Sequence, residues 1–221
     1  GFARKQTIAP KVVDLNEAVP AMLPMLGKLI GEEIEVCWRP GDDLWPVKMD
    51  PSQLDQILTN LCVNARDAIE GIGTITISTG NASVPDIPGA AARPALTDEY
   101  VVLTVIDTGH GIAPDVLEHI FEPFFTTKGV GKGTGLGLAT VEGIVEQNKG
   151  HIQVTSTPEL GTTFAVYLPR YAEPVPAPEA PGATTPVRGD GRVVMLVEDE
   201  QVVLEMASEA LQSLGYTVVA F

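Results

Sequence analysis

The hydrophobic residues of segment 54–69 follow the spacing of an amphipathic helix. Apolar side chains recur at the i, i+3, i+4 intervals that place them on one face, which predicts a helix packed on a core. Asp50 can cap this helix, and Pro51 suits its first turn. Gln53 would complete a capping box with Asp50.

Polar side chains follow one edge of that apolar face. At about 100° per residue, Asn60, Asn64 and Asp67 cluster there, whereas Arg66 projects away from them. Amide and carboxylate oxygens beside a core are good ligands for a hard cation such as magnesium. Polar residues are also common on the rim of an amphipathic helix, and this edge alone favours that simpler interpretation.

Alternating polar and apolar residues predict strands in the rest of the chain. Segments 34–38 and 45–49 are expected to pair as a hairpin across the turn at residues 40–43. Further strands are predicted at 74–79, 100–106, 151–156 and 162–168, and further helices at 18–30, 116–121 and 138–147.

Composition narrows the possible partners. The 221 residues carry a net charge of −15, which argues against nucleic acid or an anionic membrane as the main partner. A polyanion such as a nucleotide would have to be bound by local devices, such as glycine loops, helix N-termini, a metal and a few lysines. Cys37 and Cys62 are expected to be free thiols in a reducing compartment, and no apolar run approaches 18 residues. The expected location is the cytoplasm, with anchoring of a parent protein to the inner membrane left open.

The composition also divides the chain. Residues 172–191 are rich in proline and small residues, which is typical of an extended linker. Residues 9–171 form the main predicted domain, and residues 192–221 have the pattern of the opening β-α-β of a second one. The abrupt ends predict a fragment of a longer protein, with residues 1–8 as the tail of a preceding domain.

The strand at 100–106 ends in an acidic residue followed by glycines. Asp107 could accept a hydrogen bond from the amino group of an adenine, and the glycines at 109 and 111 would let the backbone approach a flat ring. Turns of the form Asp-x-Gly are frequent, so this motif alone is weak.

A glycine-rich loop at 129–137 opens directly into a helix. Free N–H groups at that helix start, with Lys128 and Lys132 nearby, would form a cradle for phosphate. The aromatic residues of segment 121–125 adjoin the loop and could anchor a mobile lid, although such residues usually lie in a core. A dinucleotide fingerprint would need a strand before the loop, and segment 124–128 does not have that pattern.

Taken in order, these motifs resemble the ATP-binding catalytic domain of sensor histidine kinases, a branch of the superfamily that includes gyrase, MutL and the large heat-shock chaperone. The resemblance implies an α+β fold, a two-layer sandwich of a mixed β-sheet packed against helices (the Bergerat-type ATP-binding fold). The segment after it resembles the start of a receiver domain, a truncated βαβ unit. Five sequence boxes of the family have counterparts here. The N box matches residues 60–68, the first glycine box 107–112 and the F box 121–125. The second glycine box matches 133–137, and a weaker third box matches 161–164.

The resemblance also implies roles for single residues, with ATP and Mg²⁺ as cofactors. Asn64 corresponds to the magnesium ligand and Asp107 to the adenine partner. Asn60 stands where the ATPase branches carry a glutamate that activates water, and an amide cannot accept that proton. We therefore expect ATP to be held intact for transfer of its γ-phosphoryl group to a histidine. The expected nucleotide contacts are Asn64, Asp67, Asp107, Gly109, Gly111, Ile112, Phe121, Thr127, Lys128, Lys132, Gly133, Thr134, Gly135, Leu136, Gly137 and Thr163.

The acceptor histidine is expected on another domain, since His110, His119 and His151 all lack the context of a phosphorylation box. The motifs resemble hybrid kinases of alphaproteobacterial cell-cycle control. They imply as partners the kinase's own dimerisation domain (a homodimer in the full protein), the receiver domain and a histidine phosphotransfer protein. Cyclic di-GMP is a further candidate ligand, although Glu142 stands where related domains often carry a tyrosine. Two alternatives stay open: a gyrase- or MutL-like ATPase, and a module that only senses a nucleotide.

Overall fold

The structure is a computed structural model that describes residues 9–83, 99–128 and 133–172, together with 192–196, 204, 208–209, 211–213 and 215–220. Chain contacts divide the protein into two units, Gly1–Glu173 and Pro174–Phe221. The predicted tail at residues 1–8, most of the predicted linker, and Lys132 lie outside the described residues. Within the described part, no helix is long and apolar enough to cross a membrane.

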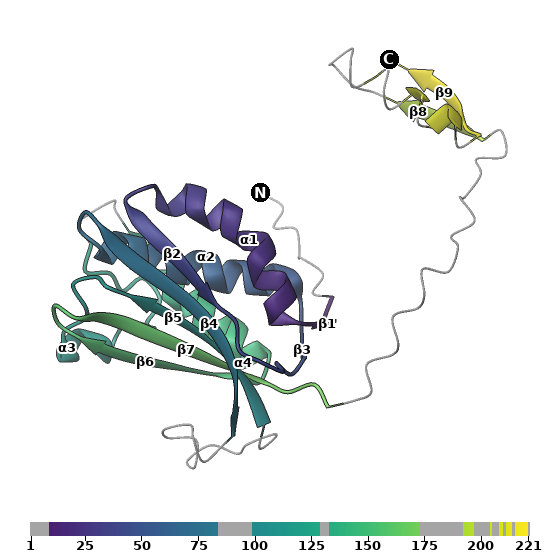
Figure 1. The fold of residues 1–221 in the computed structure, drawn as a ribbon. Helices are drawn as coiled ribbons and strands as arrows, with labels where there is room; N and C mark the ends of the chain where they lie inside the picture. The colour runs from purple at the N-terminus through teal and green to yellow at the C-terminus, as the bar shows by residue number, and fades with distance from the viewer. Residues whose placement is uncertain are drawn as a thin grey trace. The chain divides into compact units, whose positions relative to one another are not determined.

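A five-stranded mixed sheet forms one layer of the first unit (Figure 1). Its strand order is β2-β4-β5-β7-β6, and only the β2–β4 pair is parallel. The strands are β2 (Ile34–Arg39), β4 (Gly73–Ser83), β5 (Glu99–Asp107), β7 (Gly161–Pro169) and β6 (His151–Thr157).

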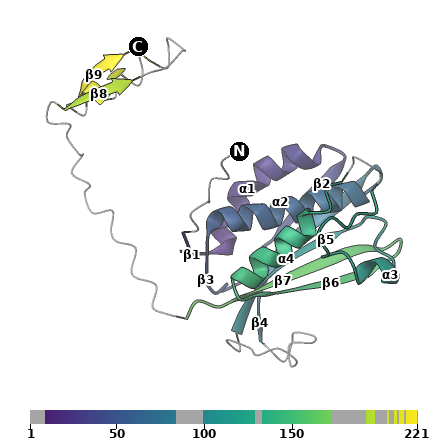
Figure 2. The ribbon, with the colours of Figure 1, turned by 180° about the vertical axis from the view of Figure 1, so that it is seen from behind.

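Three helices form the second layer. Helices α1 (Leu15–Ile30), α2 (Pro51–Ala68) and α4 (Gly137–Gln147) lie side by side on one face of the sheet (Figure 2). The short helix α3 (Pro114–Leu117) follows β5. It begins earlier and ends earlier than the predicted helix at 116–121, because Pro114 occupies its first turn and the chain turns after Leu117. The predicted two-layer α+β sandwich is confirmed.

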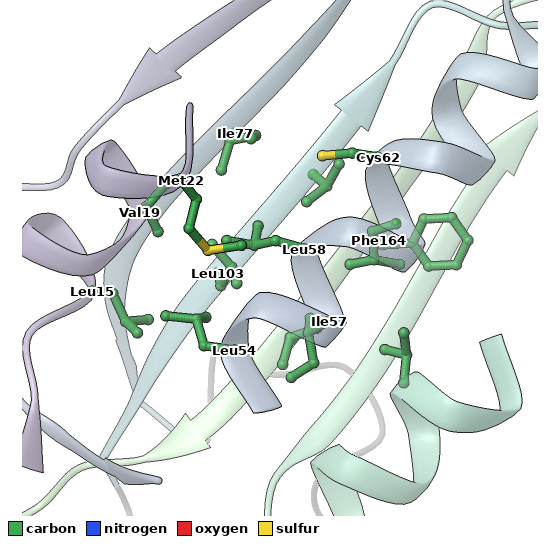
Figure 3. Close-up of a cluster of buried hydrophobic side chains, with 14 of the residues drawn as sticks. Leu15, Val19, Met22, Leu54, Ile57, Leu58, Cys62, Ile77, Leu103 and Phe164 are labelled. Carbon is green, nitrogen blue, oxygen red and sulfur yellow. The ribbon is translucent and has the colours of Figure 1, made fainter. Parts of the chain in front are cut away.

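Helix α2 supplies the centre of the core between the layers. Leu54, Ile57 and Leu58 are buried, and Leu54 and Leu58 lie on the side of α2 that faces α1 (Figure 3). From the sheet, Ile77 and Leu103 meet them, and both side chains are fully buried. Burying one such side chain contributes about 1.5–3 kcal/mol, so this interface fixes α2 firmly against the strands.

The predicted hairpin is wrong. Strand β2 pairs in parallel with β4, and β3 (Val47–Met49) pairs antiparallel with β1 (Lys11–Val13) in a separate two-stranded sheet. At the start of β2, Ile34 is buried and Glu35 is exposed, and residues 36–38 are partly buried. The alternation of apolar and polar residues in the sequence predicts which face of a strand is buried, but it carries no information about which strand lies beside it.

The predicted capping box is also only partly present. Asp50 caps α2, since its Oδ1 accepts the backbone N–H of Ser52 at 2.9 Å. Gln53 does not complete the box. Its amide donates to Gln147 Oε1 at 2.7 Å and accepts from Asn148 Nδ2 at 2.9 Å. The end of α4 covers Gln53, so its amide satisfies buried groups there and links the two helices.

In the second unit, β8 (Val193–Leu196) pairs in parallel with β9 (Thr217–Ala220). Parallel strands require a crossover connection between them, and residues 211–213, which precede β9, are helical. The assignment of this unit as the start of a receiver domain stays a prediction.

Candidate functional site

A cavity of about 1010 Å³ opens between the C-terminal half of α2, the end of β5, and the segment that leads into α4. Most of the predicted site residues meet around it, although they come from segments far apart in the sequence. Those that line the cavity are Asn60, Asn64, Asp67, Asp107, Gly111, Ile112, Thr127, Lys128, Gly133, Thr134, Gly135 and Gly137.

The two asparagines of α2 lie against the start of α4. A Cβ atom placed on Gly137 would be 3.3 Å from Asn60 Oδ1 and 3.9 Å from Asn64 Nδ2. A Cβ atom at 137 would therefore crowd the Asn60 amide and make an ordinary contact with that of Asn64. Because Gly137 opens α4, free backbone N–H groups of that helix and both side-chain amides face the same part of the cavity.

Asp107 lies at the opposite end of the cavity and is only 4% exposed. Its Oδ1 accepts the backbone N–H groups of Gly109 at 2.8 Å and Thr162 at 3.3 Å. Burial raises the pKa of Asp107, and these two hydrogen bonds oppose that shift only in part. Within the described residues no hydrogen bond reaches Oδ2, so this oxygen is available to a donor on a ligand.

Glycines after Asp107 let two parts of the backbone meet beside it. Gly111 has a φ of +69°, and a Cβ atom there would overlap the carbonyl oxygen of Thr157. At Gly109, a Cβ atom would lie 2.6 Å from the carbonyl oxygen of Ala68. The first glycine motif is therefore required for the backbone to pass this close to α2 and β6.

The aromatic segment and the second glycine motif are held side by side. The backbone N–H of Phe124 donates to the carbonyl oxygen of Gly135 at 2.8 Å. Both residues have a positive φ, +70° for Phe124 and +64° for Gly135. The Phe124 side chain is 75% exposed, whereas Phe121 packs against the core. Residues 129–132, between these two segments, lie outside the described part of the chain.

A cluster of opposite charges lies at the edge of the cavity. Asp67 Oδ2 accepts a hydrogen bond from Lys128 Nζ at 2.6 Å, and its Oδ1 accepts from the Arg66 guanidinium. Burial alone would raise the pKa of Asp67, but the hydrogen bonds and charges of Lys128 and Arg66 together lower it. The prediction that Arg66 points away was wrong, because its long side chain reaches back to the neighbouring carboxylate.

Four predicted residues do not line the cavity: Gly109, Phe121, Leu136 and Thr163. The position of Thr163 is a correction. In β7, Phe164 and Val166 are buried in the core, so strand alternation puts Thr162 on the same face and Thr163 on the other. Thr162 lines the cavity and is 4% exposed. Thr162 could have been predicted from the sequence, because it lies two residues before the core residue Phe164 and therefore on the same face of the strand.

The protein side chains of the cavity fit a magnesium ion that takes most of its other ligands from a bound nucleotide and water. Among the described residues, no group of three or more His, Cys, Asp or Glu side chains could hold a metal. Asn64 lines the cavity, and its side-chain amide carries one neutral oxygen. Mg²⁺ is commonly held by one or two protein oxygens plus substrate phosphates and water, so a single protein ligand suits it.

Comparison with known proteins agrees with this geometry. The family described as histidine kinase-, DNA gyrase B- and HSP90-like ATPases matches residues 49–172. The chain belongs to this family. Among its curated relatives, the sensor kinase CckA of Brucella abortus is 47% identical over 98% of this chain, and the sensor histidine kinase ZraS of Salmonella typhi is 39% identical over 72%. The first unit is accordingly the ATP-binding catalytic domain of a CckA-like sensor histidine kinase.

The matched region is a part of longer relatives. The alignments cover 24% of CckA and 31% of ZraS. Among solved structures, the catalytic domain of histidine kinase ThkA matches 73% of this chain and 98% of its own length, with 28% identity and a TM-score of 0.57. Full-length ShkA in complex with AMPPNP matches with 27% identity and a TM-score of 0.55, over all of this chain and 42% of its own. These neighbours confirm the predicted fold.

Proposed function

We propose that the cavity binds Mg-ATP and that the chain donates the γ-phosphoryl group to a histidine on a dimerisation domain of the parent protein, as the first step of a phosphorelay. The observation that carries this proposal is the arrangement of polar groups along one cavity. A buried carboxylate with a free oxygen lies at one end, and two amides and a helix start lie at the other.

The end formed by Asp107 and Thr162 is proposed to hold the base. Asp107 Oδ2 would accept a hydrogen bond from the amino group of adenine, while its other oxygen is fixed by backbone N–H groups. The apolar side chains of Ile112, Ile120 and Phe164 also line the cavity and can cover the faces of a flat ring.

The end formed by Asn60, Asn64 and the start of α4 is proposed to hold the phosphates. Asn64 would bind the magnesium ion, which neutralises charge on the phosphate oxygens when bound. Lys128 lines this cavity, and N–H groups at the N-terminus of α4 can donate to phosphate oxygens. Phosphoryl transfer depends mainly on positioning and charge neutralisation, and these residues supply both.

The residues beside the phosphates favour transfer over hydrolysis. Asn60 carries an amide, which cannot accept a proton from water. Asp67, the carboxylate on the same edge of α2, is paired with two cations and has a lowered pKa, so it is a poor general base. A gyrase-like ATPase is therefore disfavoured, in agreement with the histidine kinase relatives.

The proposed partners are the dimerisation domain of the parent kinase, its receiver domain and a histidine phosphotransfer protein. Cyclic di-GMP stays a candidate ligand by resemblance alone. Helix α4 carries Glu142 and Glu146. Their negative charges would repel the two phosphates of this ligand rather than attract them.

A phosphotransfer assay tests the proposal. The chain is incubated with ATP labelled at the γ-phosphate, Mg²⁺ and a separately prepared dimerisation domain of a CckA-like kinase. The expected result is acid-labile label on the dimerisation domain, none on the chain alone, and none with the Asn64→Ala variant. Steady-state release of phosphate without transfer would instead indicate an ATPase. Nucleotide binding with neither reaction would indicate a sensing module.

A further inference from the structure

Helices α2 and α4 are joined at one end by hydrogen bonds among three side-chain amides. Gln53, in the first turn of α2, donates through Nε2 to Gln147 Oε1 at 2.7 Å. Asn148, at the end of α4, donates through Nδ2 to Gln53 Oε1 at 2.9 Å and to the carbonyl oxygen of Ile144 at 2.8 Å. Gln53, the middle member of this amide cluster, is only 8% exposed.

One backbone carbonyl fixes the direction of every hydrogen bond in the amide cluster. The carbonyl oxygen of Ile144 can only accept, so the Asn148 atom that contacts it must be the amide nitrogen. The same nitrogen donates its second proton to Gln53, which must therefore present its oxygen there. The amide nitrogen of Gln53 then donates to the oxygen of Gln147. Turning over the Gln53 amide would bring two donors together, so the cluster has one consistent arrangement.

The amide cluster and the phosphate end of the cavity lie at opposite ends of the α2–α4 pair. On α2, Asn64 follows Gln53 by 11 residues, which is about 16 Å along a helix. On α4, the cluster contacts the last turn, whereas Gly137 opens the first turn and lies against Asn60 and Asn64. The two helices therefore run antiparallel, and a shift of α4 along α2 at the cluster would be felt where the phosphates are proposed to bind.

Apolar contacts make up much of the interface between these two ends. Helix α4 buries Val141, Ile144 and Val145 in the same core as α2. Hydrophobic burial has no preferred direction, so it holds α4 on α2 without fixing its exact position along the helix. Hydrogen bonds are directional, and single buried polar residues set the register between helices in coiled coils. The amide cluster thus adds a directional constraint on where α4 lies along α2.

We infer that Gln53 is a positioning residue for phosphoryl transfer, which through the amide cluster sets where the N-terminus of α4 lies relative to Asn64. This inference rests on the proposed function, in which that end of the cavity binds the phosphates of Mg-ATP. Gln53 does not line the cavity, so it acts on a nucleotide only through the two helices. Without the cluster, α4 occupies more than one position along α2. The apparent affinity for Mg-ATP then falls with the fraction of chains in the competent position.

The test compares binding of Mg-ATP with binding of adenosine, which has no phosphates, in a Gln53→Met variant. Methionine has a similar length and no amide. Affinity for Mg-ATP should fall by about three- to tenfold, the range that one hydrogen bond contributes, and affinity for adenosine should not change. Asn148→Leu, which removes the same contact from the α4 side, should give the same result. Ile144→Val, a core truncation on α4, is the control and should lower the melting temperature while keeping the parental ratio of the two affinities.

A double-mutant cycle separates positioning from simple support of the fold. Substitutions as far apart as Gln53→Met and Asn64→Ala usually have additive effects. If Gln53 acts through the position of α4, its effect on Mg-ATP affinity should largely disappear in the Asn64→Ala background. Additive effects, unchanged Mg-ATP affinity in Gln53→Met, or equal weakening of Mg-ATP and adenosine would overturn the inference while leaving ATP binding by the parent intact. A parent chain that binds neither ligand would overturn the proposed function as well.

Discussion

Lys128 Nζ lies 2.6 Å from Asp67 Oδ2 and so connects the segment before the glycine loop to helix α2. The same carboxylate also binds Arg66. Both cations therefore have an anionic partner before any phosphate is present. A triphosphate entering the cavity must compete with Asp67 for Lys128, which opposes a role of Asp67 as a simple ligand of the nucleotide.

This competition predicts the sign of one substitution. Asp67→Asn should tighten binding of ATP in the presence of EDTA by about three- to tenfold, because the two cations lose their partner and turn to phosphate. Equilibrium titration measures this effect. In a Lys128→Gln background the gain should largely disappear. Weaker binding only when Mg²⁺ is present would instead show that Asp67 orders a water molecule on the metal.

Asn64→Ala should remove the dependence of nucleotide binding on magnesium. Loss of a group that supports a metal site costs about 10- to 100-fold in metal affinity, and the fall in Mg-ATP affinity should be of this order. Titrations with and without Mg²⁺ give the comparison, and Asn81→Ala, away from the cavity, is the control. Unchanged Mg-ATP affinity in Asn64→Ala would contradict the metal assignment.

Asn60→Glu should convert the chain toward an ATPase. It places a carboxylate where the ATPase branches of the superfamily activate water, and a positioned general base accelerates proton transfer by about 100- to 10,000-fold. Steady-state phosphate release should rise over the parent rate. Asn60→Gln, which keeps the amide, should not change it. Equal rates for the two variants would remove the argument that the amide protects ATP.

Asp107→Asn should increase the stability of the fold although it removes a group proposed to bind the nucleotide. Burial raises the pKa of Asp107 above its ordinary value of 3.8, so the ionised form is unfavourable in the folded state. This cost is absent below pH 3.8 and grows as pH rises through the folded pKa. The variant should melt at a higher temperature than the parent at pH 7, and the difference should shrink as pH falls. A lower melting temperature at pH 7 would contradict this account.

The central helix and the place of Asp107 in the cavity could be predicted because both lie in recognisable local patterns. The apolar spacing of Leu54, Ile57 and Leu58 already contains the face that α2 buries. Asp107 directly follows an apolar strand, although a carboxylate followed by glycines is by itself a common turn sequence. The order of the five motifs along the chain indicated the family more strongly than any single motif did.

Other features depend on which segments meet in space. The Gln53 side chain was assigned to a local capping box, but the end of α4, 94 residues away, offers it better partners. The residues that pair with β2 lie 39 positions further along the chain, and the alternation within β2 cannot identify them. Arg66 and Lys128 converge on Asp67 because long side chains reach beyond the direction that a helical projection assigns them.

The most direct test of a cavity that holds Mg-ATP is titration of the chain with a non-hydrolysable ATP analogue, with and without Mg²⁺, for the parent and Asp107→Asn. The account predicts one bound analogue per parent chain, tighter binding with Mg²⁺, and loss of measurable binding in the variant. Equal binding by the parent and Asp107→Asn, or no binding by the folded parent, would contradict it.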